Sequence, residues 1–221
     1  IGRIIMVDRT KQLAFYFDQT KCMGCQTCVV ACKDWNKLQP GTAKLRKLHV
    51  TEMGTFPNVS VFMTVFGCNH CANPACIEAC PFDAIYKRPE DGIVVIDRDV
   101  CQGNGSCKSA CPYDAPQFPD DEQEAPQLSV TTPTKGHKMV KCNMCIDRVA
   151  IGQKPACVAA CLTRAIDFGT VEYIEEKYPD AQTVKNNDNL VGFPEDTANI
   201  AGNLTDAFRT TPSFYFKPRH V

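Results

Sequence analysis

The spacing of its cysteines constrains the fold of this chain more than any other feature of the sequence. The 221 residues include 15 cysteines, which fall into four groups with none left over. They are Cys22, Cys25, Cys28 and Cys32 (group I); Cys68, Cys71, Cys76 and Cys80 (group II); Cys101, Cys107 and Cys111 (group III); and Cys142, Cys145, Cys157 and Cys161 (group IV). Group I has the C-x2-C-x2-C-x3-C spacing with which bacterial ferredoxins hold iron-sulfur clusters. Four groups of this kind predict four clusters.

Group III lacks one cysteine of this pattern. The stretch from Asp99 to Pro112 reads DVCQGNGSCKSACP, and Asn104 occupies the position of the second cysteine. Each iron of a cubane cluster needs one protein ligand besides its three sulfides, so the missing thiolate predicts a [3Fe-4S] cluster here. A smaller thiolate set should also raise the reduction potential of this site. The alternative is a fourth [4Fe-4S] cluster, with the amide oxygen of Asn104 as a weak ligand.

Two other uses of cysteine fit the spacing less well. An odd number of cysteines cannot pair completely in disulfides, and a chain of this length does not need such cross-links. Structural zinc sites usually take two C-x2-C pairs from separate loops, whereas three cysteines on one short loop crowd a single zinc ion. We therefore interpret the groups as iron-sulfur sites and keep zinc as the alternative, which metal analysis would reveal.

The secondary structure expected around the cysteines is a repeat of strand, cysteine loop and short helix. An apolar strand over 13–18 leads into group I, and the same order recurs at 93–97 before group III. Between the repeats, 43–52 and 58–66 predict a β-hairpin insertion. Further helices are expected at 29–36, 146–151 and 171–178, and further strands at 82–87 and 165–168.

Two sets of side chains near the cysteines need a separate interpretation. The first arm of the predicted hairpin is basic, with Lys44, Arg46, Lys47 and His49, and we interpret it as a solvated face rather than a docking surface. His70 lies inside group II. Because four cysteines are already available there, we expect His70 beside the ligands or at the surface rather than bound to iron.

Composition and hydropathy exclude several classes of function. The formal net charge is −1, so nothing indicates a nucleic-acid partner. The longest apolar run, 59–66, is far too short to cross a bilayer, so we expect any membrane contact to go through a partner. Residues 1–20 contain no recognisable export signal. We also find no nucleophile, acid-base pair or phosphate-binding loop, which argues against substrate chemistry on this chain.

Two segments have the composition of connections rather than of a core. Residues 112–137 are rich in proline, acidic residues and threonine and predict an exposed connection. Residues 180–213 contain few apolar anchors. The stretch from Pro212 to His220 either adds one strand or clamps onto a partner.

The four groups together resemble a known family. Their order, the segments FDQTKCMGCQTC and CNHC, and the runs KCNMCIDRV and ACVAAC are similar to the iron-sulfur electron-transfer subunit of the dimethyl sulfoxide reductase family of molybdopterin oxidoreductases. The resemblance covers about residues 13–169 and implies an α+β fold of two interleaved bacterial-ferredoxin-like modules, with a β-hairpin insertion and an extended C-terminal tail. The modules it implies are residues 1–66 with 135–180 and residues 67–134, followed by a partner-docking tail over 181–221.

The resemblance also implies which cysteines share a cluster. In two-cluster ferredoxins the fourth cysteine of one run binds the other cluster, so the groups exchange their last ligands. Three [4Fe-4S] clusters and one [3Fe-4S] cluster follow. The implied sets are Cys22, Cys25, Cys28 and Cys161; Cys32, Cys142, Cys145 and Cys157; Cys68, Cys71, Cys76 and Cys111; and Cys80, Cys101 and Cys107 with Asn104 at the vacant position.

The function implied by the resemblance is a relay of single electrons. The relay runs between a large molybdopterin (molybdenum or tungsten) catalytic subunit and a membrane quinone-linked anchor subunit or another carrier, soluble or haem-containing. The complex would be peripheral and membrane-associated, at the periplasmic rather than the cytoplasmic face, exported with its partner. The alternatives are a free-standing polyferredoxin and an electron-transfer subunit of formate dehydrogenase or hydrogenase type.

Overall fold

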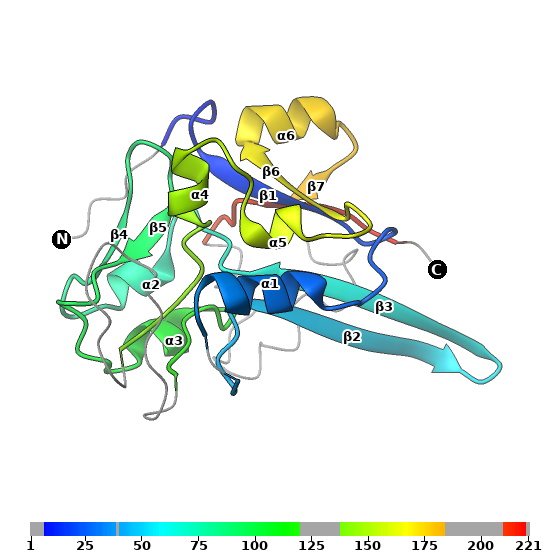
Figure 1. Ribbon diagram of the computed structural model, residues 1–221, viewed down its shortest axis with the longest axis horizontal. Helices are drawn as coiled ribbons and strands as arrows, with labels where there is room; N and C mark the ends of the chain where they lie inside the picture. Colours follow the sequence, from blue (N-terminus) through cyan, green and yellow to red (C-terminus); the bar gives the residue numbers. More distant parts are fainter. Residues whose placement is uncertain (1–6, 39, 120–137, 184–209, 220–221) are drawn as a thin grey trace.

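The computed structural model describes residues 7–38, 40–119, 138–183 and 210–219 as a mixture of helix and sheet (Figure 1). Its strands are β1 (Leu13–Asp18), β2 (Arg46–Thr55), β3 (Asn58–Gly67), β4 (Ile85–Lys87), β5 (Val94–Ile96), β6 (Ile166–Thr170), β7 (Gln182–Thr183) and β8 (Phe214–Lys217). Its helices are α1 (Thr27–Trp35), α2 (Ala75–Glu78), α3 (Ser106–Ala110), α4 (Ile146–Ala150), α5 (Ala156–Ala159) and α6 (Val171–Lys177). The helices are short because most of them only carry the chain away from a cysteine loop.

A four-stranded sheet with the order β6-β1-β8-β7 forms the centre of the fold. β1 runs antiparallel to β6 and parallel to β8. Its alternating side chains are apolar on both faces: Phe15 and Phe17 lie in the largest core cluster, whereas Ala14 and Tyr16 pack in a second cluster with Ile174 of α6. Such two-sided burial is typical of a central strand. The strand predicted at 13–18 is confirmed.

The C-terminal segment completes this sheet. Phe15 of β1 lies opposite Phe214, and Phe17 lies opposite Phe216, so the last strand pairs with the first. Phe214 and Phe216 are each 1% exposed. Of the two roles left open for this segment, the strand is therefore the one observed.

Helix α6 is tied to the sheet through Asp167 of β6. The carboxylate accepts hydrogen bonds from Lys177 Nζ at 2.8 Å, Tyr178 OH at 2.8 Å and Lys154 Nζ at 3.0 Å. Burial alone would raise the pKa of Asp167, but these donors outweigh it and hold the pKa well below its usual value.

The predicted insertion is a long hairpin of β2 and β3, paired from Arg46 with Gly67 at its base to Thr55 with Asn58 at its tip. Figure 1 shows this hairpin extending away from the body of the protein. Its base is buried, with Phe62 and Phe66 each 1% exposed, whereas Phe56 at the tip is 92% exposed. The hairpin is confirmed, but the solvated basic face is wrong for Arg46, which points into the interior and is only 2% exposed. It is also wrong for Lys47, whose side chain is 18% exposed and donates to the carbonyl of Asp114 at 2.7 Å.

A second, short hairpin of β4 and β5 follows group II. Its turn contains Gly92, whose φ of +71° favours glycine. The strand predicted at 82–87 is shorter than expected, since only its last three residues pair with β5. Residues 113–117 are not the exposed connection that composition predicts: Tyr113 is 3% exposed, and Gln117 forms a β-bridge with Val140. Residues 120–137 and 184–209 of the two predicted connections lie outside the described residues.

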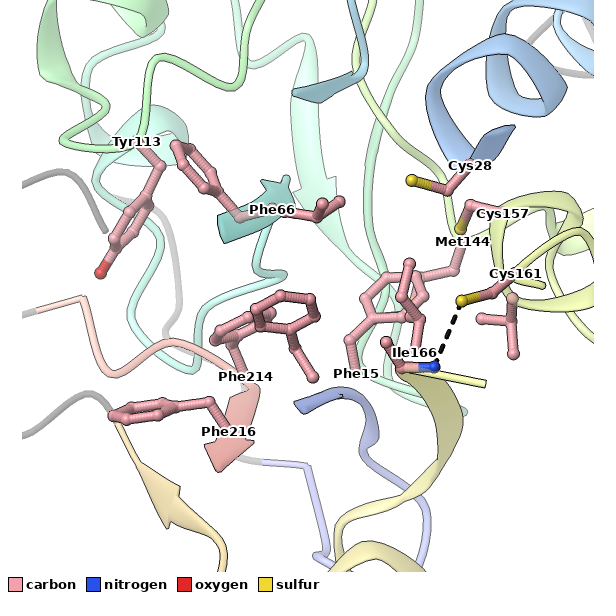
Figure 2. Packing of buried hydrophobic residues seen from close by; sticks show 14 of the residues in the cluster. Phe15, Cys28, Phe66, Tyr113, Met144, Cys157, Cys161, Ile166, Phe214 and Phe216 are labelled. Atoms are coloured by element: carbon pink, nitrogen blue, oxygen red, sulfur yellow. Dashed lines mark hydrogen bonds between the residues drawn. The ribbon is translucent and has the colours of Figure 1, made fainter. Parts of the chain in front are cut away.

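The largest core cluster contains both aromatic side chains and cysteines. In Figure 2, Phe66, Phe214 and Phe216 lie on one side, and the thiols of Cys28 and Cys157 lie on the other. Helix α1 packs on α5, and α2 packs on α3. Cysteine loops from distant parts of the sequence are therefore brought next to one another.

Candidate iron-sulfur sites

All fifteen cysteines are free thiols, and each group lies in or beside a loop that contains a left-handed turn. Such turns occur at Gln26 in group I, His70 in group II, Gly105 in group III and Cys145 in group IV, each with positive φ. Consecutive residues that combine right- and left-handed conformations turn their N–H groups toward one side, which favours the binding of anions such as thiolates and sulfides.

The first set of thiols surrounds a cavity between the group I loop and the end of group IV. Its lining cysteines are Cys22, Cys25, Cys28 and Cys161, and the space, part of it open to solvent, is about 320 Å³. The backbone N–H of Ala165 points at Cys161 Sγ at 3.2 Å (Figure 2), and Thr27 Oγ1 donates to Cys25 Sγ at 3.4 Å. Cys25 is exposed, so this set reaches the protein surface.

The second set lies around another cavity, of about 390 Å³ with its open part, lined by Cys68, Cys71, Cys76 and Cys111. Asn69 also lines it and is 1% exposed, yet neither its amide nitrogen nor its amide oxygen has a hydrogen-bond partner among the described residues. A buried amide without a partner is unfavourable. Cluster sulfides in this cavity would accept its N–H groups, so the residues present fit an iron-sulfur cluster.

The third set contains the three cysteines nearest Asn104. Cys80, Cys101 and Cys107 line a cavity of about 260 Å³ together with Asn104. Both ends of the Asn104 side chain are engaged locally: Oδ1 accepts the N–H of Ser106 at 3.2 Å, and Nδ2 donates to Ser106 Oγ at 3.0 Å. The amide thus stabilises the start of α3.

The fourth set consists of Cys32, Cys142, Cys145 and Cys157. Cys32 belongs to a cluster of buried residues, and the partly buried Cys142 packs against that cluster. Burial raises the pKa of the Cys32 thiol most, and the thiolates of Cys142, Cys157 and Cys145 raise it further. The N–H of Met144 points at Cys142 Sγ at 3.4 Å.

Within the described residues, no three histidine, cysteine, aspartate or glutamate side chains converge closely enough to hold a single metal ion. The thiols of three sets are instead spread around cavities. This arrangement suits a cluster of several irons better than one zinc ion.

Comparison with known proteins identifies the family. A model described as a 4Fe-4S dicluster domain matches residues 59–171. The B subunit of the anaerobic dimethyl sulfoxide reductase of Escherichia coli (strain K12) is 41% identical over 183 residues, which cover 79% of this chain and 82% of that protein. The corresponding subunit of Haemophilus influenzae is 37% identical over 228 residues, which cover 96% of this chain and 100% of that protein. This protein belongs to the iron-sulfur subunits of the dimethyl sulfoxide reductase family.

A more distant relative is part of a different enzyme. The formate dehydrogenase-O iron-sulfur subunit of E. coli is 32% identical over 181 residues, covering 75% of this chain and 55% of that protein. The resemblance inferred from the motifs is confirmed, and so is electron transfer as the role of the family. In the part of the chain that the structure describes, none of the helices has the length and hydropathy to span a bilayer.

Burial controls the acidity of the thiols in this iron-sulfur subunit. It raises the pKa of Cys142 and of Cys76 to about 12 and that of Cys28 to about 11. Such thiols stay protonated at neutral pH unless positive charge is bound beside them. Iron supplies that charge, so binding of clusters and deprotonation of the cysteines are coupled.

Several buried cations around the sets were missed by sequence reasoning. Lys141 is 2% exposed with Nζ 3.8 Å from Cys68 Sγ, and Lys87 is 5% exposed and donates to the carbonyl of Cys71 at 2.8 Å. Arg98, 1% exposed, is within the electrostatic reach of Cys101. The position of Lys141 directly before Cys142 was the only signal in the sequence.

His70 lies in the interior rather than at the surface. It is fully buried, and its Nδ1 accepts the N–H of Val94 at 3.0 Å, which leaves the proton on Nε2. Burial first, and then the charges of Lys141, Lys87 and Arg46, lower its pKa well below the usual value. His70 is therefore a neutral imidazole beside the cysteines.

Proposed function

We propose that this subunit conducts single electrons through four iron-sulfur clusters arranged in a row. The supporting observation is how the helices that carry cysteines pack. Helix α1, which carries Cys28 of the first set, packs on α5, which carries Cys157 of the fourth. Cys142 of the fourth set is within electrostatic reach of Cys68 of the second. Helix α2, which carries Cys76 of the second set, packs on α3, which carries Cys107 of the third. The order along the row is thus first, fourth, second and third set.

The ligand sets follow the resemblance. In this proposal three [4Fe-4S] clusters are held by Cys22, Cys25, Cys28 and Cys161; by Cys32, Cys142, Cys145 and Cys157; and by Cys68, Cys71, Cys76 and Cys111. A [3Fe-4S] cluster is held by Cys80, Cys101 and Cys107. The hydrogen bonds of the Asn104 amide to Ser106 favour this cluster over a fourth cubane, because iron would have to compete with the N–H of Ser106 for the amide oxygen.

Two interleaved modules would carry these clusters. The pairing of β1 with β6 and the packing of α1 on α5 favour one module from residues 1–66 and 135–180. The pairing of β4 with β5 and the packing of α2 on α3 favour a second module from residues 67–134. The strand β8 ties part of the C-terminal segment, 181–221, back to the first module.

Part of the row lies against a buried apolar core. Bound clusters would accept and release one electron each. Phe15, Phe66 and Phe214 pack in the same core cluster as cysteines of the first, second and fourth sets, so apolar side chains lie beside these thiols. Buried Lys141 and Lys87 supply positive charge beside the second set.

The partners follow from the names of the relatives, which are components of larger enzymes. We infer a large molybdopterin-containing catalytic subunit at one end of the row, and a membrane anchor or soluble carrier at the other. The periplasmic face stays a prediction, tested by protease accessibility of the complex in intact spheroplasts.

The test is anaerobic purification of the chain at native expression, followed by iron, sulfide and EPR analysis. We expect co-purification of a large subunit and signals from four clusters, one of them a three-iron signal in the oxidised protein. Zinc without iron and sulfide would overturn the proposal. A fully folded chain with four clusters and no large subunit would instead establish the polyferredoxin alternative. The mass of the large subunit decides between the dimethyl sulfoxide reductase and formate dehydrogenase types.

A further inference from the structure

Arg46 is a buried cation in direct contact with a cysteine of the fourth set. It begins β2 opposite Gly67 and is 2% exposed. Its Nη2 donates to Cys157 Sγ at 3.3 Å, and its guanidinium carbon lies 4.5 Å from the centre of the Phe15 ring. The aromatic face and the hydrogen bond together hold the guanidinium in one orientation.

The charges around Arg46 belong to two different sets of thiols. Cys157, Cys142 and Cys32 of the fourth set act on its guanidinium, and so does Cys28 of the first set. None of the ion pairs between described residues includes Arg46. Burying a guanidinium without negative charge nearby is unfavourable. The thiolates of the two sets are therefore its counter-charges.

A fixed cation at this junction affects reduction more than ligation. Reduction adds one electron to a cluster without forming or breaking a bond, so the negative charge beside Arg46 increases. In an interior of low dielectric constant a nearby positive charge stabilises the added electron. A hydrogen bond to a ligating sulfur acts in the same direction, because it withdraws electron density from the cluster.

We propose that Arg46 is a positioning residue that raises the reduction potentials of the two clusters on either side of it, those of the first and fourth sets. The effect is larger for the fourth set, since Arg46 donates its hydrogen bond to Cys157 of that set. This inference rests on the proposed function, because it requires clusters at both sets.

The experiment compares variants of the full chain in its native complex, by redox titration followed with EPR. Arg46→Gln removes the positive charge. Arg46→Lys retains the charge but lacks the planar guanidinium group with its several N–H donors. The matched control is Arg164→Gln, because Arg164 is exposed and donates to the carbonyl of Cys161 at 3.4 Å. Solvent and salt screen an exposed charge, so this control should change the ratio of reduced to oxidised cluster less than about twofold.

For Arg46→Gln we expect the ratio of reduced to oxidised cluster, measured at fixed potential, to fall at least about tenfold for one cluster and by less for a second. Tenfold corresponds to about 59 mV for a one-electron couple. Arg46→Lys should restore most of the loss. The three-iron signal is the internal reference, because the third set stands at the far end of the proposed row from the first and fourth sets.

Each outcome decides the inference. Clusters that load fully in Arg46→Gln with unchanged potentials would overturn it. If Arg46→Gln fails to load its clusters but Arg46→Lys loads them, the charge is needed to assemble the clusters rather than to set their potentials, and the inference is wrong. If both variants fail to load, the shape of arginine rather than its charge is needed, and the inference is wrong. A wild-type chain without iron and sulfide would refute the proposed function instead.

Discussion

Replacing Asn104 with cysteine should convert the third site into a four-iron site. Asn104 lines the cavity of Cys80, Cys101 and Cys107 and occupies the position of the missing cysteine. A thiolate there completes the ligand set of a cubane, so Asn104→Cys should bind one more iron per chain. We also expect the variant to lower the reduction potential of this site, because the added thiolate donates charge to the cluster.

The structural cost of this substitution is small. Asn104→Cys removes two hydrogen bonds to Ser106, of 3.0 and 3.2 Å, at the start of α3. Because Asn104 is exposed, we assign the pair about 1–2 kcal/mol. In a protein of this size that lowers the melting temperature by about 2–8 °C. Typical stabilities are about 5–15 kcal/mol, so the variant should still fold and bind its other clusters.

Low-temperature EPR of the oxidised protein, combined with iron analysis, is the decisive measurement. The three-iron signal should disappear in Asn104→Cys, and a four-iron signal should appear after reduction. Asn104→Ala is the matched control, since it loses the same hydrogen bonds without adding a thiol and should keep the three-iron signal. A wild-type protein without that signal, or a cysteine variant that retains it, would refute the reasoning.

Three further substitutions test the fold. Phe216→Ala should cost about 3–5 kcal/mol in thermal unfolding of the anaerobic holo-protein, because it empties a core position that is 1% exposed. Asp167→Asn should lower stability at pH 7. The difference in unfolding free energy between variant and wild type should narrow as the pH falls below about 4. The depressed pKa of Asp167 gives its full stabilisation above the pKa of the unfolded chain, and this is lost as the pH falls toward the pKa of the folded state. Gly92→Ala should destabilise more than Gly152→Ala. Both have positive φ, but only at Gly92 would the new Cβ collide with another side chain, at 2.1 Å from Gln12 Oε1; equal melting temperatures would contradict this.

The elements near the cysteines could be predicted from sequence because their signals are local. The alternation of Phe15 and Phe17 with Ala14 and Tyr16 predicts β1. The turn over 53–57, with its glycine and proline between two strand candidates, predicts the hairpin of β2 and β3. The interpretation failed for residues 113–117 and for Arg46. In both places polar residues suggested solvent, but contacts with distant parts of the chain bury them.

The sequence by itself determined the chemistry that this chain can support. Thiolate ligands are side chains at short spacings, so the four cysteine groups and the gap at Asn104 can be recognised without a fold. The tertiary structure alone decided what surrounds them. The pairing of β1 with β8 and the contact of Arg46 with Cys157 each join residues more than a hundred positions apart. Such contacts depend on how strands and helices pack, and no short-range pattern in the sequence encodes them.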